Sequence, residues 1–116
     1  MKLTRKALME KGAEVSAKRA VDFENMAREK DASASARMFP TLMILMGGLT
    51  INRLADNLGL TKEDNEVDVT KEMFDDAMSK VVADATSSEN ASIITGLESM
   101  MFCIAMSDAL FGEEKE

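Results

Sequence analysis

Carboxylates are the side chains most able to do chemistry in this sequence, because it contains no histidine, tyrosine or tryptophan. That absence removes the usual general base, the commonest transition-metal ligand and the phenolic acid. The acids are concentrated in an acidic block, which consists of Asp56, Glu63, Asp64, Glu66, Asp68, Glu72, Asp75 and Asp76. Such a block is typical of a solvated face, of a cation site or of a surface that docks on a basic partner.

Part of the acidic block has the spacing of a calcium-binding loop. Oxygen-bearing side chains at residues 64, 66, 68, 70, 72 and 75 fall at loop positions 1, 3, 5, 7, 9 and 12, and the segment resembles an EF-hand. The resemblance implies calcium ligands at Asp64, Glu66, Asp68, Glu72 and Asp75. However, residue 69 is a valine where the loop requires glycine, and the last position lacks the longer bidentate glutamate. The same acids are also expected without calcium, because negative charges near a helix N-terminus interact favourably with the helix dipole. We therefore expect no bound metal or cofactor.

A second cation hypothesis concerns the helix that follows the acidic block. Glu72, Asp75 and Asp76 lie one turn apart, which is similar to the carboxylate spacing that holds magnesium in all-helical nucleotide pyrophosphohydrolases. The resemblance implies a metal-dependent hydrolase with a second acidic pair, for which Glu10 and Glu14 are the nearest candidates. Because that family's E-E-x-x-E pattern is absent, we expect a protein that is not an enzyme.

The segment Leu54–Thr61 resembles the core of a helix-turn-helix motif, in which a small residue and a glycine let two helices cross tightly. The recognition helix that the motif implies would present Glu63, Asp64 and Glu66 to the phosphates. Repulsion there would cancel the contacts that position such a motif on a duplex. We therefore expect no direct binding of nucleic acid.

The net charge of −7 is unevenly distributed along the chain. Residues 1–37 hold nine Lys/Arg against six Asp/Glu, whereas residues 38–116 hold five against fifteen. This asymmetry favours contacts between copies of the chain or with a basic protein surface. One hypothesis is a small acidic inhibitor, of the type that mobile elements encode against host defence, which occupies a nucleic-acid or nucleotide site on its target.

The elements that must position these residues are predicted to be helices. Apolar spacing and capping residues predict helices over residues 4–30, 38–59, 70–85 and 88–111. These helices indicate an all-α single domain over residues 1–112 that is similar to a four-helix bundle, and two helical hairpins are one arrangement of such a domain. Residues 113–116 form an acidic tail. One cysteine, Cys103, and the absence of an apolar leader after Lys2 predict a reducing, cytoplasmic location.

The second predicted helix contains the longest apolar run of the chain. No charge occurs from Phe39 to Leu49, and apolar residues occupy every side of the helix, so we expect it to be buried. The run is too short for a membrane span. Pro40 suits the first helical turn, and Gly59 is expected to end the helix in a left-handed conformation with Leu60 packed behind it.

Glycines indicate where helices approach each other. Gly47 and Gly48, together with Gly96, predict close packing of the second helix on the fourth. We therefore expect replacement of Gly48 by leucine to cost more stability than replacement of Gly12.

Methionine is the unusual residue of this composition, with eleven copies against five phenylalanines. Met43, Met46, Met100 and Met101 fall among apolar helix positions and predict either a flexible core or an adaptable protein-contact surface. The fourth helix is expected to carry one broad apolar face, which consists of Ile93, Ile94, Leu97, Met100, Met101, Ile104 and Ala105. The apolar content predicts a non-enzymatic protein-interaction module that forms a homo-oligomer through a Met-rich interface.

Overall fold

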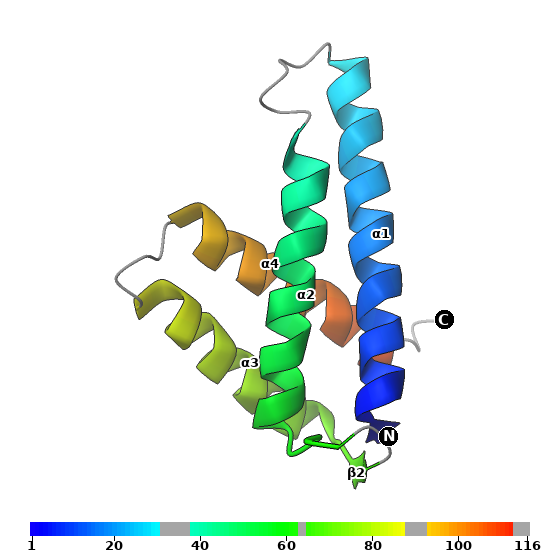
Figure 1. The fold of residues 1–116 in the computed structure, drawn as a ribbon, viewed down its shortest axis with the longest axis vertical. Helices are drawn as coiled ribbons and strands as arrows, with labels where there is room; N and C mark the ends of the chain where they lie inside the picture. Colours follow the sequence, from blue (N-terminus) through cyan, green and yellow to red (C-terminus); the bar gives the residue numbers. More distant parts are fainter. Residues whose placement is uncertain (31–37, 63–64, 88–92, 113–116) are drawn as a thin grey trace.

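The computed structural model describes residues 1–30, 38–62, 65–87 and 93–112, and within them the chain forms four helices and one short antiparallel ladder. The helices are α1 (Arg5–Glu29), α2 (Phe39–Asn57), α3 (Lys71–Ser87) and α4 (Ile93–Phe111). α1 and α2 lie side by side and run antiparallel, and α3 and α4 form a second hairpin whose α4 passes behind α2 (Figure 1). The predicted all-α, bundle-like fold is thereby confirmed.

The first and third helices each begin after a threonine that caps the helix, and Thr70 was the predicted cap of α3. The hydroxyl of Thr4 accepts a hydrogen bond from the backbone N–H three residues further on (3.1 Å), and the hydroxyl of Thr70 does the same at α3 (3.1 Å). Each hydroxyl satisfies an N–H group that has no partner within its helix. Ser88 and Asn90, the residues of the sequence suited to cap α4, lie outside the described residues, as do the connector 31–37 and the tail 113–116.

The C-terminal end of α2 also follows the sequence. Gly59 has a φ of 81°, the left-handed conformation that glycine adopts without steric cost. The N–H of Leu60 then donates to the carbonyl of Ala55 (2.9 Å), and the Leu60 side chain is buried. This arrangement turns the chain sharply and directs it toward the ladder.

The ladder was not expected from the sequence. β1 (Lys2–Thr4) pairs antiparallel with β2 (Glu66–Asp68), so that Leu3 lies opposite Val67. The segment that forms β2 is acidic and lacks an apolar period, and its partner lies more than sixty residues away in the sequence. Because a strand of three residues is stabilised by its pairing and not by its own pattern, no local signal predicts it.

The core lies where the two hairpins and the ladder meet. Its fully buried large side chains come from every helix and from the segments that precede and follow β2 in the sequence: Leu8, Leu54, Leu60, Val69, Phe74, Val81, Phe102 and Met106. On α3, the buried residues Phe74, Ala77, Val81 and Ala85 have the predicted spacing of three and four. α3 therefore packs with the amphipathic side that its sequence indicates.

α1 and α2 cross closely because glycines face larger residues on the opposite helix. A Cβ atom on Gly12 would lie 2.8 Å from Cγ1 of Ile51. A Cβ atom on Gly47 would collide with the hydroxyl of Ser16 on α1 and would lie 3.2 Å from Cε1 of Phe102 on α4. Gly47 is thus in close contact with two helices, and the closest contact that a larger residue would make there is with α1.

The expectations for Gly48 and Gly96 were wrong. Gly48 is exposed and a Cβ atom there would meet no atom within 4 Å, because one residue rotates the position by about 100° away from Gly47. A Cβ atom on Gly96 would lie 2.6 Å from Cγ2 of Thr86, so Gly96 packs against α3 and not against α2. Gly12, and not Gly48, is the position that a larger residue would disturb.

Candidate protein-contact surface

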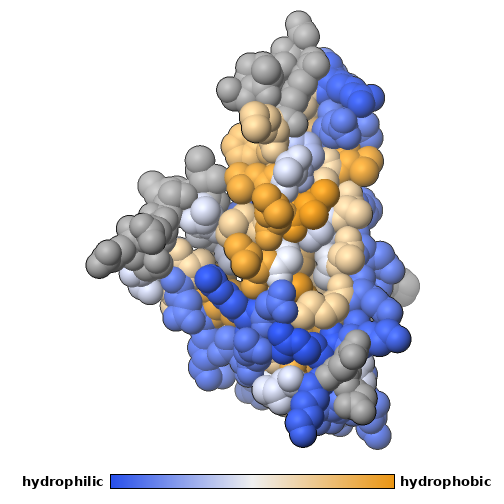
Figure 2. Space-filling view, in the orientation of Figure 1, coloured by the Kyte–Doolittle hydropathy of each residue, from blue (hydrophilic) through white to orange (hydrophobic). Residues whose placement is uncertain are grey.

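The outer side of α2 is an exposed apolar surface. Ile44, Leu45 and Leu49 are 50%, 61% and 55% exposed, and hydrophobic residues gather along α2 on the side of the molecule shown in Figure 2. The buried residues of α2 lie on the opposite side and are Met43, Gly47, Thr50, Ile51, Leu54 and Ala55. The expectation that α2 is buried on every side was therefore wrong, because its neighbours cover only part of its circumference.

α4 packs on the core with only part of its apolar surface. Phe102, Cys103 and Met106 are buried, together with small polar residues. Four residues of the predicted broad apolar face are substantially exposed: Leu97 (48%), Met100 (37%), Met101 (51%) and Ile104 (49%). The side chains of Ile93 and Ile94 lie outside the described part of the structure. α4 is apolar on almost every side, so apolar periodicity alone does not determine which side packs.

Two polar side chains fix the rotation of α4. The carboxylate of Glu98 accepts two hydrogen bonds from the guanidinium of Arg19 on α1, both of 3.0 Å, and both side chains are largely buried. The hydroxyl groups of Thr50 on α2 and Ser99 on α4 lie 3.1 Å apart in the core. A buried charge or hydroxyl without a partner is costly, so these pairs determine which side of α4 faces α1 and α2.

The remaining side of α4 carries a continuous apolar row. Glu98 contacts α1, Ser99 contacts α2 and Gly96 faces α3, so three sides of the helix have neighbours. The row on the free side, which we name the α4 stripe, consists of Leu97, Met100, Met101 and Ile104. Its spacing of three, one and three residues places all four side chains along one side of the helix.

The methionines singled out from the sequence are divided between the core and the surface. Met43 is buried within the chain and Met46 is half-buried, so neither contributes much to an exposed surface. Met100 and Met101 belong to the α4 stripe. Methionine side chains are flexible and polarizable and can adapt to a partner of irregular shape.

The acidic block does not converge on one point. Its described residues are distributed over the end of α2, β2 and the start of α3, and several form ion pairs. The pairs are Asp56 with Arg5 (2.8 Å), Asp68 with the N-terminal ammonium (3.1 Å), Asp75 with Lys71 (3.1 Å) and Asp76 with Lys80 (3.6 Å). Glu66 and Glu72 are exposed, and Glu63 and Asp64 lie outside the described residues. These pairs reduce the free negative charge that a basic partner would meet.

The described residues contain no group of three or more Asp, Glu, Cys or His side chains close enough to hold a metal ion. In the segment that resembles a calcium loop, Glu66 and Asp68 are in β2 and the carboxylate of Asp68 is directed to the chain's own ammonium group. Asp75 is engaged by Lys71. Extended backbone does not wrap these oxygens around a common centre as a calcium loop does.

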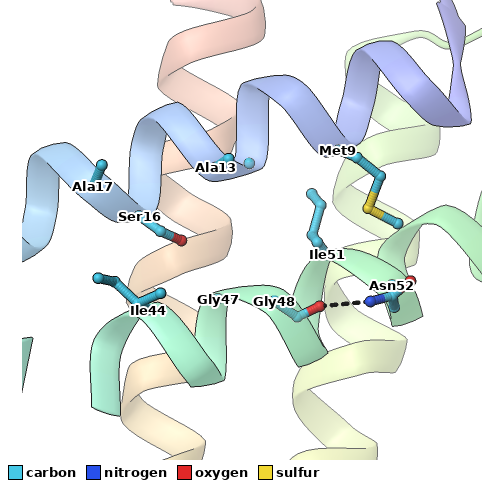
Figure 3. Close-up of a pocket in the computed structure, with 10 residues that line it drawn as sticks. Met9, Ala13, Ser16, Ala17, Ile44, Gly47, Gly48, Ile51 and Asn52 are labelled. Carbon is cyan, nitrogen blue, oxygen red and sulfur yellow. Dashed lines mark hydrogen bonds between the residues drawn. The ribbon is translucent and has the colours of Figure 1, made fainter. Parts of the chain in front are cut away.

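A shallow groove follows the crossing of α1 and α2. It encloses about 290 Å³ and is lined largely by apolar and small residues, among them Met9, Ala17 and Ile44 (Figure 3). The amide of Asn52 donates to the carbonyl of Gly48 (2.9 Å), and its oxygen accepts from Arg5 (3.0 Å). The groove thus presents mainly apolar surface, and no ionisable side chain is among its lining residues.

Cys103 belongs to the core. It is fully buried beside Phe102, and desolvation by this burial raises the pKa of its thiol from 9.0 to about 12. The nucleophilic form of cysteine is the thiolate, which such an environment suppresses at neutral pH. Cys103 therefore acts as a small apolar side chain.

Comparison with protein-family models, with curated proteins and with solved structures found no match to this chain. Within the described ranges, no helix combines the length and the apolar character needed to cross a membrane.

Proposed function

We propose that the protein is a non-enzymatic helical module for protein contact, which self-associates through the α4 stripe. The observation that carries this proposal is the row of four large apolar side chains on the free side of α4, each between 37% and 51% exposed. Scattered apolar residues are normal on a protein surface, whereas a contiguous row along one helix marks an interaction surface.

The charges of α4 favour a protein partner over a lipid surface. The helix from Ile93 to Phe111 contains Glu98 and Asp108 but no lysine or arginine. Helices that lie on membranes combine an apolar side with basic residues that bind anionic lipid headgroups. The α4 stripe lacks that basic flank, so an apolar protein surface is its better complement.

The size of the α4 stripe sets the expected strength of association. Complete burial of one large apolar side chain contributes about 1.5–3 kcal/mol, and each of these side chains is already half-covered, so a partner adds about 1 kcal/mol for each. Two copies together would gain about 8 kcal/mol, which is comparable with the cost of association of about 4–15 kcal/mol. We therefore expect reversible association that depends on protein concentration.

A non-enzymatic role is supported by the chemistry of the described residues. The thiol of Cys103 is buried, the carboxylates of Asp56, Asp68 and Asp75 are engaged in ion pairs, and the polar groups of Asn52 are used within the fold. None of these groups is arranged as a nucleophile beside a base.

The test measures molar mass by sedimentation velocity and light scattering between about 1 and 100 µM, the range in which weak association is populated. We expect the wild-type mass to rise above 12.7 kDa with concentration. Met101→Glu places a charge in the α4 stripe and should remain a monomer throughout, since an unpaired charge is costly to bury.

Leu45→Glu is the matched control, because Leu45 is 61% exposed on the outer side of α2 and lies outside the α4 stripe. This variant should associate as the wild type does, and circular dichroism should show the same helix content for all three proteins. A wild type that stays monomeric, or equal loss of association in both variants, would contradict the proposal.

A further inference from the structure

The α4 stripe has the same pattern in both directions along the helix. From Leu97 the next members follow at intervals of three, one and three residues, and the order from Ile104 backwards gives the same intervals. In either direction, a γ- or β-branched residue stands at each end and two methionines stand in the centre. A row with this symmetry presents the same order of side chains to a second copy turned end to end, as a twofold interface requires.

We propose that two copies of the chain pair their α4 stripes antiparallel about a twofold axis that passes between Met100 and Met101. This inference rests on the proposed self-association and specifies its partner and geometry. In the pair, Leu97 of each copy faces Ile104 of the other, and the central methionines pack on one another. The α4 stripe lies on the side opposite the contacts of α4 with α1 and α2, and its four side chains are exposed.

Charge favours the antiparallel direction over the parallel one. Asp108 is exposed and continues the row of the α4 stripe one turn beyond Ile104. In a parallel pair the two Asp108 carboxylates would face each other, which is unfavourable. In the antiparallel pair they lie about 15 residues apart along the axis, about 22 Å at 1.5 Å per residue, which exceeds the screening length of about 8 Å at physiological salt.

The helix ends favour the same direction. The N-terminus of a helix carries a partial positive charge and the C-terminus a partial negative charge. Antiparallel helices place these opposite charges side by side, and parallel helices place like charges together. α4 has no basic side chain that could offset the repulsion between like helix ends in a parallel pair.

Cross-linking between two variants, each of which carries one added cysteine in a Cys103→Ala background, tests this register. Leu97→Cys and Ile104→Cys are prepared separately, one with a tag, and are mixed at a concentration where sedimentation shows the wild type as a dimer. Antiparallel pairing brings residue 97 of one chain beside residue 104 of the other. The two copies of residue 97 then lie about 10 Å apart along the axis, beyond the Cα separation of about 7 Å that a disulfide allows.

We expect mild oxidation of the mixture to give mainly the mixed disulfide, at least fivefold over either homodimeric disulfide. Each variant alone should give little cross-linked product. The wild type, which retains Cys103, is the control and should give none, because that thiol is buried.

The outcomes separate the two proposals. Homodimeric disulfides without the mixed product would mean that α4 pairs in parallel, which would overturn the antiparallel inference and leave the self-association intact. If the cysteine variants sediment as dimers but form no disulfide in any combination, another surface mediates the contact and the inference is overturned. A chain that is monomeric at every concentration would overturn both.

Discussion

The contrast between two neighbouring glycines of α2 gives the sharpest test of the crossing of α1 and α2. Gly47→Ala and Gly48→Ala are the same change at adjacent positions of one helix. Each replaces glycine by a better helix former and gains up to about 1 kcal/mol of helix propensity. A Cβ atom at 48 meets nothing within 4 Å, so Gly48→Ala should stabilise the protein by about 0.5–1 kcal/mol.

Gly47→Ala should destabilise the protein although it gains the same helix propensity as Gly48→Ala. The new methyl group collides with the Ser16 hydroxyl, and rotation of that hydroxyl leaves the Ser16 Cβ at 3.3 Å and the Phe102 ring at 3.2 Å. The Ser16 Cβ is fixed to the backbone of α1, and the Phe102 ring is buried in the core, so neither has free space to move into. Overpacking of this kind costs about 1–3 kcal/mol, so the net loss should be about 1 kcal/mol and the two variants should differ by about 2 kcal/mol.

Thermal unfolding followed by circular dichroism measures this difference. At about 4 °C per kcal/mol for a chain of this length, the melting temperatures of the two variants should differ by about 8 °C. Protein concentration is held constant, because self-association would itself raise the melting temperature. Ser16→Gly in the Gly47→Ala background removes the colliding atoms and should recover part of the loss. Equal melting temperatures for the two alanine variants would refute the close crossing described above.

Two further predictions concern α4. Arg19→Met should cost about 3 kcal/mol in the free energy of unfolding, since it leaves Glu98 largely buried without its partner, and the double variant with Glu98→Met should recover most of that loss in urea unfolding. Stability should also fall as the pH rises from about 9 toward 12, because the thiol of Cys103 ionises in the unfolded chain but stays protonated in the fold, and Cys103→Ala should lack this contribution. Additive losses in the first case, or an unchanged pH profile for Cys103→Ala in the second, would contradict these assignments.

The predictable part of the fold is the part whose signals are local. The capping hydroxyls of Thr4 and Thr70 and the left-handed Gly59 determine helix ends through atoms only a few residues away. The amphipathic spacing of α3 likewise determines its buried side, because polar residues occupy the other sides. These features depend on residues within one or two helical turns, so a short stretch of sequence is enough to predict them.

The part that escaped prediction depends on distant partners. The rotation of α4 is decided by Arg19 and Thr50, which lie on two other helices. Gly12 has a structural role only because Ile51 stands opposite it. The presence of Glu98 and Ser99 in an otherwise apolar helix was nevertheless a usable signal, since a polar residue in such a helix usually requires a buried partner. That signal would have placed the α4 stripe on the surface.

The ladder between β1 and β2 has a consequence for the order of events during synthesis. Leu3 is made early, but its partner Val67 follows 64 residues later. At about 5–20 residues per second, the ribosome takes about 3 to 13 seconds to cover that distance. α1 and α2 can meet within this interval, whereas the first residues wait with their apolar side chain uncovered until β2 emerges. The ladder can therefore form only after both helices of the first hairpin have been synthesised.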